Sequence, residues 1–239
     1  MRRYSHTHIV IVGGGSGIGL ATAQEALERG AQVTIVGRSK DKLQQANEKL
    51  NGSLGICQAD VMQEDSLVTT FKEIGRFDHL FVSAAEGVTV PLAKSSVDQL
   101  RPTLDIKIWG ALLCSKHAAK WISPGGSVTF ISGLAGRRGY GGFAVAGAAN
   151  AGVEALARNL AVELAPIRFN TVCAGVIDTA MLDSVFGEKR EEIVAEISKK
   201  LPVGRIGSAS EIADAVLFLM GNSFVTGSTL LVDGGDALV

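Results

Sequence analysis

The sequence lacks most of the features that mark secreted, membrane-spanning or metal-binding proteins. It has only three cysteines, Cys57, Cys114 and Cys173, which are scattered and form no CxxC pair. This odd number of isolated cysteines argues against a disulfide framework and favours small core residues in a reducing compartment, so we expect a cytoplasmic protein. The four histidines form no HExxH motif, and no metal centre is expected. Apolar runs such as residues 9–12 are too short to cross a membrane, and residues 1–6 lack the apolar stretch of a secretory signal.

The sequence also lacks a strong charge of either sign. The formal net charge of the 239 residues is −1, so nothing favours nucleic acid or an anionic membrane as a partner. Hydrophobic residues make up 46% of the chain and charged residues 20%, which is typical of a globular protein with a large core. Because there is no repeat, linker or break in composition, we expect one domain over residues 1–239 that acts on a small molecule.

Short β-rich runs alternate with helical patterns along the whole chain. This alternation is typical of a parallel sheet with helices on both faces, so we expect an α/β, doubly wound Rossmann fold of about seven strands. Strands are expected at residues 8–12, 32–36, 54–58, 79–83, 127–131, 167–172 and 229–232. Helices are expected at residues 17–30, 40–50, 66–74, 97–121, 145–164 and 210–220, with Pro102 interrupting the long fourth helix or delaying its start.

A glycine-rich turn joins the first expected strand to the first helix. It contains Gly13, Gly15, Ser16, Gly17, Ile18 and Gly19, with the spacing Gly-xxx-Gly-x-Gly rather than GxGxxG. Glycines are needed where the chain turns tightly, where its backbone touches a pyrophosphate and where the helix packs on the strand. The free N–H groups and the dipole of the helix then hold the phosphates. The position of the turn at the start of a βαβ unit therefore predicts a dinucleotide site.

The residues after the second expected strand indicate which dinucleotide binds. An acidic residue there would hold the 2′-hydroxyl of NAD, but this chain has Arg38 followed by Ser39. A guanidinium is the group expected for a 2′-phosphate, so the predicted cofactor is NADP(H), whereas a solvated surface charge is the alternative interpretation of Arg38. Asp60 and Val61 end the third strand, where Asp60 either reaches the adenine or caps the next helix.

With these features in place, the chain resembles the short-chain dehydrogenase/reductase family over nearly its whole length. Beyond the glycine turn and Asp60-Val61, the segments that carry the resemblance are 83–85 (SAA), 131–136 (ISGLAG), 154–157 (EALA), 168–172 (RFNTV), 202–207 (PVGRIG) and 225–235 (VTGSTLLVDGG). The resemblance implies an oxidoreductase whose cofactor site includes Ala84 and Ala85. It further implies that Thr179 contacts the nicotinamide carboxamide and that a mobile substrate loop follows Thr179.

The resemblance fails at the catalytic positions. The family's tetrad of Asn, Ser, Tyr and Lys falls here on Lys107, Gly133, Ala146 and Asn150, and Ser132 stands next to the serine position. Two of these departures are reciprocal, because the cation and the amide at positions 107 and 150 are exchanged. The resemblance implies that these two side chains lie near each other beside the nicotinamide ribose.

Three interpretations of this exchange are open. In the first, Lys107, Ser132 and Asn150 form a non-standard catalytic site that acts on a carbonyl or alcohol, and burial of Lys107 lowers its pKa towards neutrality. In the second, the site has decayed, Lys107 points to solvent, and the protein is an NADP(H)-binding sensor or an inactive partner subunit. The third is Schiff-base chemistry at Lys107.

The remaining expectations concern loops and assembly. Tyr140 should border the pocket, either supplying a phenol or packing, and Glu86 faces its mouth or solvent. Arg137 and Arg138 either bind an acidic substrate or keep their loop soluble. The helix at residues 145–164 is rich in Ala and Gly, and the family pairs through this helix, so we expect a homodimer or homotetramer.

Overall fold

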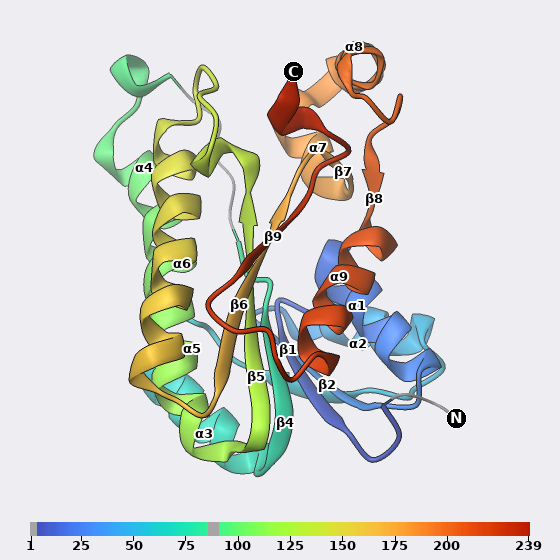
Figure 1. Ribbon diagram of the computed structural model, residues 1–239, viewed down its shortest axis with the longest axis vertical. Helices are drawn as coiled ribbons and strands as arrows, with labels where there is room; N and C mark the ends of the chain where they lie inside the picture. Colours follow the sequence, from blue (N-terminus) through green and yellow to red (C-terminus); the bar gives the residue numbers. More distant parts are fainter. Residues whose placement is uncertain (1–3, 86–90) are drawn as a thin grey trace.

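The computed structural model describes residues 4–85 and 91–239, which form a doubly wound α/β fold (Figure 1). Parallel strands build a seven-stranded sheet, as the sequence predicts, and their order in the sheet is β3-β2-β1-β4-β5-β6-β9. The chain order reverses between β1 and β4, so the topological switch point of the sheet lies there. The strands are β1 (His8–Val12), β2 (Gln32–Gly37), β3 (Gly55–Gln58), β4 (Phe77–Val82), β5 (Ile122–Gly133), β6 (Arg168–Ala174) and β9 (Thr229–Val232), with a small separate pair, β7 (Ile177–Asp178) and β8 (Gly207–Ser208).

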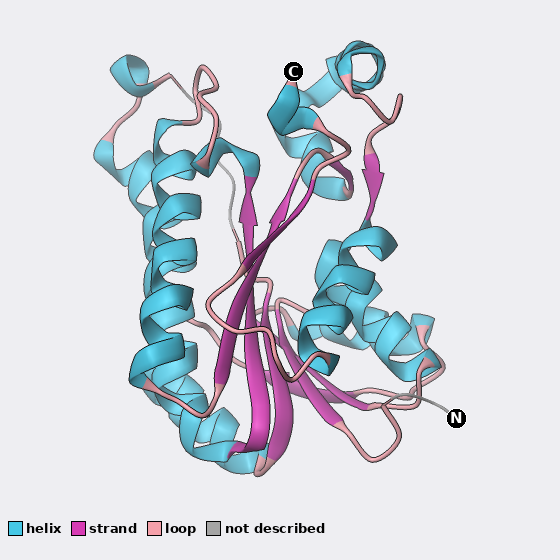
Figure 2. Cartoon of the chain, viewed as in Figure 1, coloured by secondary structure: helices cyan, strands magenta, loops and turns pink. Residues whose placement is uncertain are grey.

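Helices cover both faces of the sheet (Figure 2). The helices α1 (Gly17–Glu28), α2 (Lys40–Lys49) and α9 (Ala209–Gly221) lie on one face. The other face carries α3 (Glu64–Ile74), α4 (Val97–Leu104), α5 (Gly110–Ala118) and α6 (Ala144–Glu163). Because both faces are covered, the central strands are almost continuously buried and two hydrophobic cores form, one on each side.

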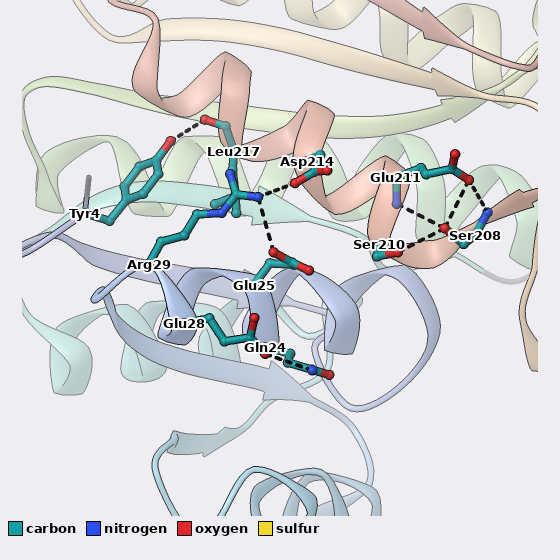
Figure 3. A network of polar contacts seen from close by, with 10 residues as sticks. All are labelled: Tyr4, Gln24, Glu25, Glu28, Arg29, Ser208, Ser210, Glu211, Asp214 and Leu217. Carbon is teal, nitrogen blue, oxygen red and sulfur yellow. Dashed lines mark hydrogen bonds and ion pairs between the residues drawn. The ribbon is translucent and has the colours of Figure 1, made fainter. Parts of the chain in front are cut away.

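A polar network holds α1 against α9 (Figure 3). The guanidinium of Arg29, just after α1, pairs with Glu25 at 3.2 Å and with Asp214 of α9. The hydroxyl of Tyr4 donates a hydrogen bond to the carbonyl of Leu217. These contacts fix the far end of α1, so that its first turn keeps its place at the carboxyl ends of the strands.

The expected elements are confirmed with shifts of at most two residues at their ends, apart from β5, which begins five residues earlier than expected, and two corrections. The long helix expected at 97–121 is divided into α4, a π-helical turn η2 (Asp105–Trp109), α5 and a 3₁₀ turn at Ala119–Trp121. Pro102 lies inside α4 and does not cause the division, which begins at Asp105. The loop expected after Thr179 is helical, because α7 (Ala180–Phe186) and α8 (Arg190–Lys200) follow it. Both lie at the carboxyl end of the sheet, near the C-terminus (Figure 1).

No helix among the described residues is both long and apolar enough to cross a membrane. Nor do these residues contain a group of three or more His, Cys, Asp or Glu side chains placed to hold a metal ion.

Candidate active site

The glycine turn between β1 and α1 is packed so tightly that larger residues do not fit. Gly13 and Gly17 have positive φ angles of 86° and 53°, which favour glycine. A Cβ on Gly19 would lie 2.2 Å from the carbonyl oxygen of Gly13, and a Cβ on Gly13 would lie 2.7 Å from the backbone nitrogen of Ala84. The turn therefore touches both its own helix and the segment after β4, where Ala84 and Ala85 lie partly buried.

The first turn of α1 is suited to bind an anion. Ser16 occupies the N-cap position, but its side chain makes no capping hydrogen bond, and the first turn contains no acidic residue. Backbone N–H groups at this end thus lack a side-chain acceptor, and the helix dipole adds to their attraction for phosphate. Ile18 is partly buried and packs against the core on that side of the sheet. The cradle fits a dinucleotide pyrophosphate.

Thr179 lies on the opposite side of this cradle. Its methyl carbon is 3.7 Å from the point where a Cβ on Gly17 would stand. Thr179 also starts α7, as the residue before its first turn. The fold thus brings together two predicted cofactor residues that are far apart in the sequence.

The predicted adenosine end lies where β2 and β3 finish. Arg38 is exposed, and its carbonyl accepts a hydrogen bond of 2.9 Å from the side chain of Gln58. Ser39 caps α2, and its hydroxyl accepts a hydrogen bond of 3.3 Å from the backbone of Lys42. These contacts place Arg38 and Ser39 together at the first turn of α2.

Asp60 and Val61 follow β3. The carboxylate of Asp60 accepts a hydrogen bond of 3.0 Å from the backbone of Met62, whereas the N-cap position of α3 belongs to Gln63. Val61 is buried, and its side chain lies 3.0 Å from where a Cβ on Gly110 would stand. Val61 thus links the end of β3 to the start of α5.

Lys107 stands in the π-helical turn η2. The backbone nitrogen of Gly110 donates to the carbonyl of Asp105, five residues earlier, which is the hydrogen bond of a π-turn. Such turns shift the direction of the following side chains and occur often at functional sites. A Cβ on Gly110 would crowd the side chain of Val61, whose nearest carbon lies 3.0 Å from that position.

The environment of Lys107 is unusual for a lysine. Its side chain is partly buried, and burial lowers its pKa to about 8, an effect that Cys173 partly offsets. Within residues 4–85 and 91–239, its ammonium has no hydrogen-bond or ion-pair partner. The lowered pKa has the direction that the catalytic interpretation predicts, and the side chain is not fully exposed to solvent.

Asn150 comes from the helix that packs against η2. It is buried, one turn after Ala146 in α6, and α6 and η2 are in contact. Its amide nitrogen lies 3.0 Å from the point where a Cβ on Gly133 would stand, so the amide occupies the space above Gly133. Among the described residues, the amide of Asn150 has no hydrogen-bond partner. Lys107 and Asn150 thus bring two polar groups without protein partners onto adjacent elements.

Ser132 belongs to a buried polar cluster at the end of β5. Its hydroxyl donates a hydrogen bond of 2.8 Å to Glu154, a buried carboxylate of α6. Arg137 binds both oxygens of Glu154, at 2.8 Å from Nη2 and 3.3 Å from Nε. Cys173 pairs in register with Ser132 on β6, and burial raises the pKa of its thiol. Ser132 is a candidate from the sequence, whereas the role of Glu154 was not predicted, because its only signal is a carboxylate on an apolar stretch of helix.

The loop after β5 is tied to the C-terminal segment. Arg138 donates to the carbonyl and carboxylate oxygens of Asp236 at 2.5 and 3.1 Å, and the Tyr140 hydroxyl donates to the other carboxylate oxygen at 3.3 Å. Tyr140 also lines a cleft of about 310 Å³ beside the first turns of α6, next to Phe143. Both arginines of the loop thus have a carboxylate of the protein as partner. Glu86 lies outside the described residues.

The comparisons with known proteins agree with this geometry. A family profile described as Enoyl-(Acyl carrier protein) reductase matches residues 13–236. The peroxisomal 2,4-dienoyl-CoA reductase of Danio rerio is 34% identical over 98% of this chain and 86% of its own length. Carbonyl reductase family member 4 of the same fish is 33% identical over 96% of this chain and 98% of its own. A small-chain dehydrogenase solved in complex with NADPH is 33% identical, with a TM-score of 0.85, over 98% of this chain and 99% of its own.

Proposed function

The chain belongs to the short-chain dehydrogenase/reductase family, and we propose that it is an NADP(H)-dependent oxidoreductase that interconverts a carbonyl and an alcohol on a small molecule. The observation that carries this proposal is Lys107, a partly buried ammonium with a lowered pKa and no partner in the described protein, on the element beside Asn150. The related NADPH complex supports the choice of cofactor.

The chain's own residues divide the work of holding the cofactor. The turn containing Gly13, Gly17 and Gly19 and the first turn of α1 hold the pyrophosphate, and Arg38 holds the 2′-phosphate. Thr179 orients the nicotinamide end. When bound, the nicotinamide supplies or accepts the hydride.

In this proposal the usual Asn-Ser-Tyr-Lys tetrad is replaced. Lys107 as ammonium holds the oxygen of the substrate by charge and delivers a proton to it as negative charge develops, a task for which a pKa of about 8 is suitable. Asn150 donates or accepts a hydrogen bond beside it. Ser132 helps to hold the site in place, because its hydroxyl donates its proton to Glu154 and not to the substrate.

The cofactor assignment is tested by binding titrations with NADPH and NADH. We expect the wild type to bind NADPH much more tightly, and Arg38→Asp to reverse the preference, because the aspartate removes a cation and repels the 2′-phosphate. Equal affinities of the wild type for the two dinucleotides would contradict the assignment.

The catalytic assignment is tested by following NADPH oxidation with a panel of aldehydes, ketones and quinones. Lys107→Met should abolish turnover while leaving NADPH affinity nearly unchanged. Lys72→Met, which removes an exposed lysine of α3, is the matched control and should retain full activity. A wild type that binds NADPH but reduces no member of the panel would favour the alternative, a cofactor-binding protein without turnover.

We further propose that residues 1–239 act as one domain in a cytoplasmic homodimer or homotetramer. The exposed face of α6 carries small residues together with Val162, whose side chain is 81% exposed. Small residues permit close approach of a second helix. Light scattering that shows a monomer at micromolar concentration would contradict this assembly. Cys57, Cys114 and Cys173 are unpaired thiols, which agrees with a reducing compartment.

A further inference from the structure

Residues 233–238 form a turn that is held together by one of its own carboxylates. The carboxylate of Asp233 accepts hydrogen bonds from the backbone nitrogen of Gly235 at 3.0 Å and from that of Ala237 at 2.8 Å. The second half of the turn is the 3₁₀ element η6 (Asp236–Leu238). This 233–238 turn lies at the carboxyl end of the sheet, beside α7 (Figure 1).

One side of the 233–238 turn packs against the segment that follows α8. The backbone nitrogen of Val203 donates a hydrogen bond of 3.3 Å to the carbonyl of Gly234. A Cβ on Gly234 would stand 2.7 Å from the side chain of Val203, and a Cβ on Gly235 would stand 2.6 Å from the ring of Pro202. Both glycines also have positive φ angles, 65° and 90°, so a side chain would be strained at either position. The turn is therefore in backbone contact with the segment that leads back from Thr179, α7 and α8.

The other side of the 233–238 turn binds the loop between β5 and α6. Nη1 of Arg138 donates to the backbone carbonyl of Asp236 at 2.5 Å and to its carboxylate at 3.1 Å, and the Tyr140 hydroxyl donates to the second carboxylate oxygen at 3.3 Å. The guanidinium also lies 5.4 Å from the centre of the Tyr140 ring, which packs edge-on against Phe143. The side chain of Asp236 is only 14% exposed, so water screens this ion pair less than it screens a surface pair. The loop leads into α6, the helix that carries Asn150.

We propose that the 233–238 turn is a clasp that makes the two sides of the candidate site open and close together. It joins the loop after β5 on one side to the segment after α8 on the other. The contacts with Pro202 and Val203 are close backbone packing, whereas the contacts of Asp236 are polar and partly open to water. The bonds from Arg138 and Tyr140 to Asp236 are therefore the ones that break when the clasp opens. This coupling stands on the contacts themselves, and its effect on substrate binding rests on the proposed function.

The clasp is tested by amide hydrogen exchange, which needs no substrate. Asp236→Asn keeps the size of the side chain but removes the charge that holds Arg138. Exchange in residues 134–143 and in residues 177–203 should rise together, by about threefold to tenfold relative to α5, because loss of a partly buried charge-assisted bond makes opening easier by that factor. Tyr140→Phe, which removes only the hydroxyl, should give a smaller rise in the same two segments.

The controls separate the clasp from a general loss of stability. Asp65→Asn removes an exposed carboxylate of α3, at the opposite end of the molecule, and should change neither segment (Figure 1). Arg138→Gln should act like Asp236→Asn, and the double variant should show no larger effect than either single variant, because all three lose the same contact. A rise confined to residues 134–143, a rise shared equally by α5, or no rise at all would overturn the clasp.

The effect on substrate binding is measured with any aldehyde, ketone or quinone that the wild type reduces. Asp236→Asn should raise KM by about threefold to tenfold while kcat and NADPH affinity change little, because the clasp orders the walls of the site and not the reacting groups. An unchanged KM would refute control of substrate binding by the clasp. A wild type that reduces no member of the panel would refute the proposed function, and hydrogen exchange would still decide whether the clasp exists.

Discussion

Replacing Lys107 with Met should make the protein more stable at pH 7 while it removes the proposed activity. Burial lowers the pKa of Lys107 from its ordinary value of 10.5 to about 8, so the fold resists the charged form that prevails at pH 7. At about 1.4 kcal/mol per pH unit of lowering, the charge destabilises the folded state by up to about 3 kcal/mol. Because Lys107 is only partly buried, some of this is relieved by water, and we expect Lys107→Met to raise the free energy of unfolding by about 1–3 kcal/mol.

The dependence on pH separates this charge effect from a packing effect. The pKa of Lys107 is lower in the folded state than in the unfolded state, so the penalty is complete below about pH 8 and shrinks as the pH rises towards 10.5. The free energies of unfolding of the wild type and Lys107→Met, measured with urea at pH 7 and pH 9.5, should therefore differ less at the higher pH. Lys72→Met should differ from the wild type by less than about 0.5 kcal/mol at both. If Lys107→Met is less stable than the wild type at pH 7, or if the difference in free energy of unfolding does not change with pH, the buried charge of Lys107 does not destabilise the fold.

Two further predictions concern the core and the site. His79 is buried with its ring 2.9 Å from the hydroxyl of Ser127, and its pKa is lowered to about 4, so the wild type should lose up to about 3 kcal/mol as the pH falls from 6.5 to 4. His79→Gln should show a smaller loss over the same range in urea unfolding, and an equal loss would contradict this account. Gly133→Ser should lower stability by about 1 kcal/mol in the same assay, because its Cβ would stand 3.0 Å from the amide of Asn150. Adding Asn150→Ala should recover most of that loss, and failure to do so would show that the crowding lies elsewhere.

The positions of the strands along the chain could be predicted from sequence because they depend on local pattern. Residues 9–12, for example, are continuously apolar and buried, as parallel strands covered on both faces must be, and Gly13 follows them. The division of the helix at Asp105 could not be predicted in this way. The residues of η2 fit a continuous helix equally well, and Gly110, which ends the π-turn, packs beside Val61, a contact between segments far apart in the chain.

The helices after Thr179 were missed for a different reason. Helix α8 has no fully buried residue, so the apolar stripe that reveals an amphipathic helix is weak. Its acidic first turn and basic last turn do favour a helix, but the resemblance to a substrate loop outweighed that signal. The strands β7 and β8 have two residues each and exist only because they pair with each other across the intervening helices.

The same holds for the candidate site: residues next to a recognisable motif could be predicted, whereas contacts between distant segments could not. The glycine turn, Arg38 and the exchange of Lys107 and Asn150 are visible in the sequence, because each stands at a fixed distance from a recognisable element. The partners Glu154 and Asp236 are not, since Asp236 meets Arg138 across 98 positions of the chain. A sequence therefore reveals which polar groups a site contains more readily than it reveals the hydrogen-bond and ion-pair partners of those groups.

The packing around Asn150 bears on whether the exchanged site has decayed. Its amide fills the space above Gly133, so the absence of a side chain at position 133 and the presence of the amide at position 150 fit each other. Lys107 keeps a charge that costs stability, although a Met of similar length would remove the cost. Functional sites keep local conflicts that the rest of the protein offsets. A destabilising ammonium beside a fitted glycine–amide pair is what the proposed catalytic role of Lys107 predicts, and the turnover of Lys107→Met distinguishes that role from decay.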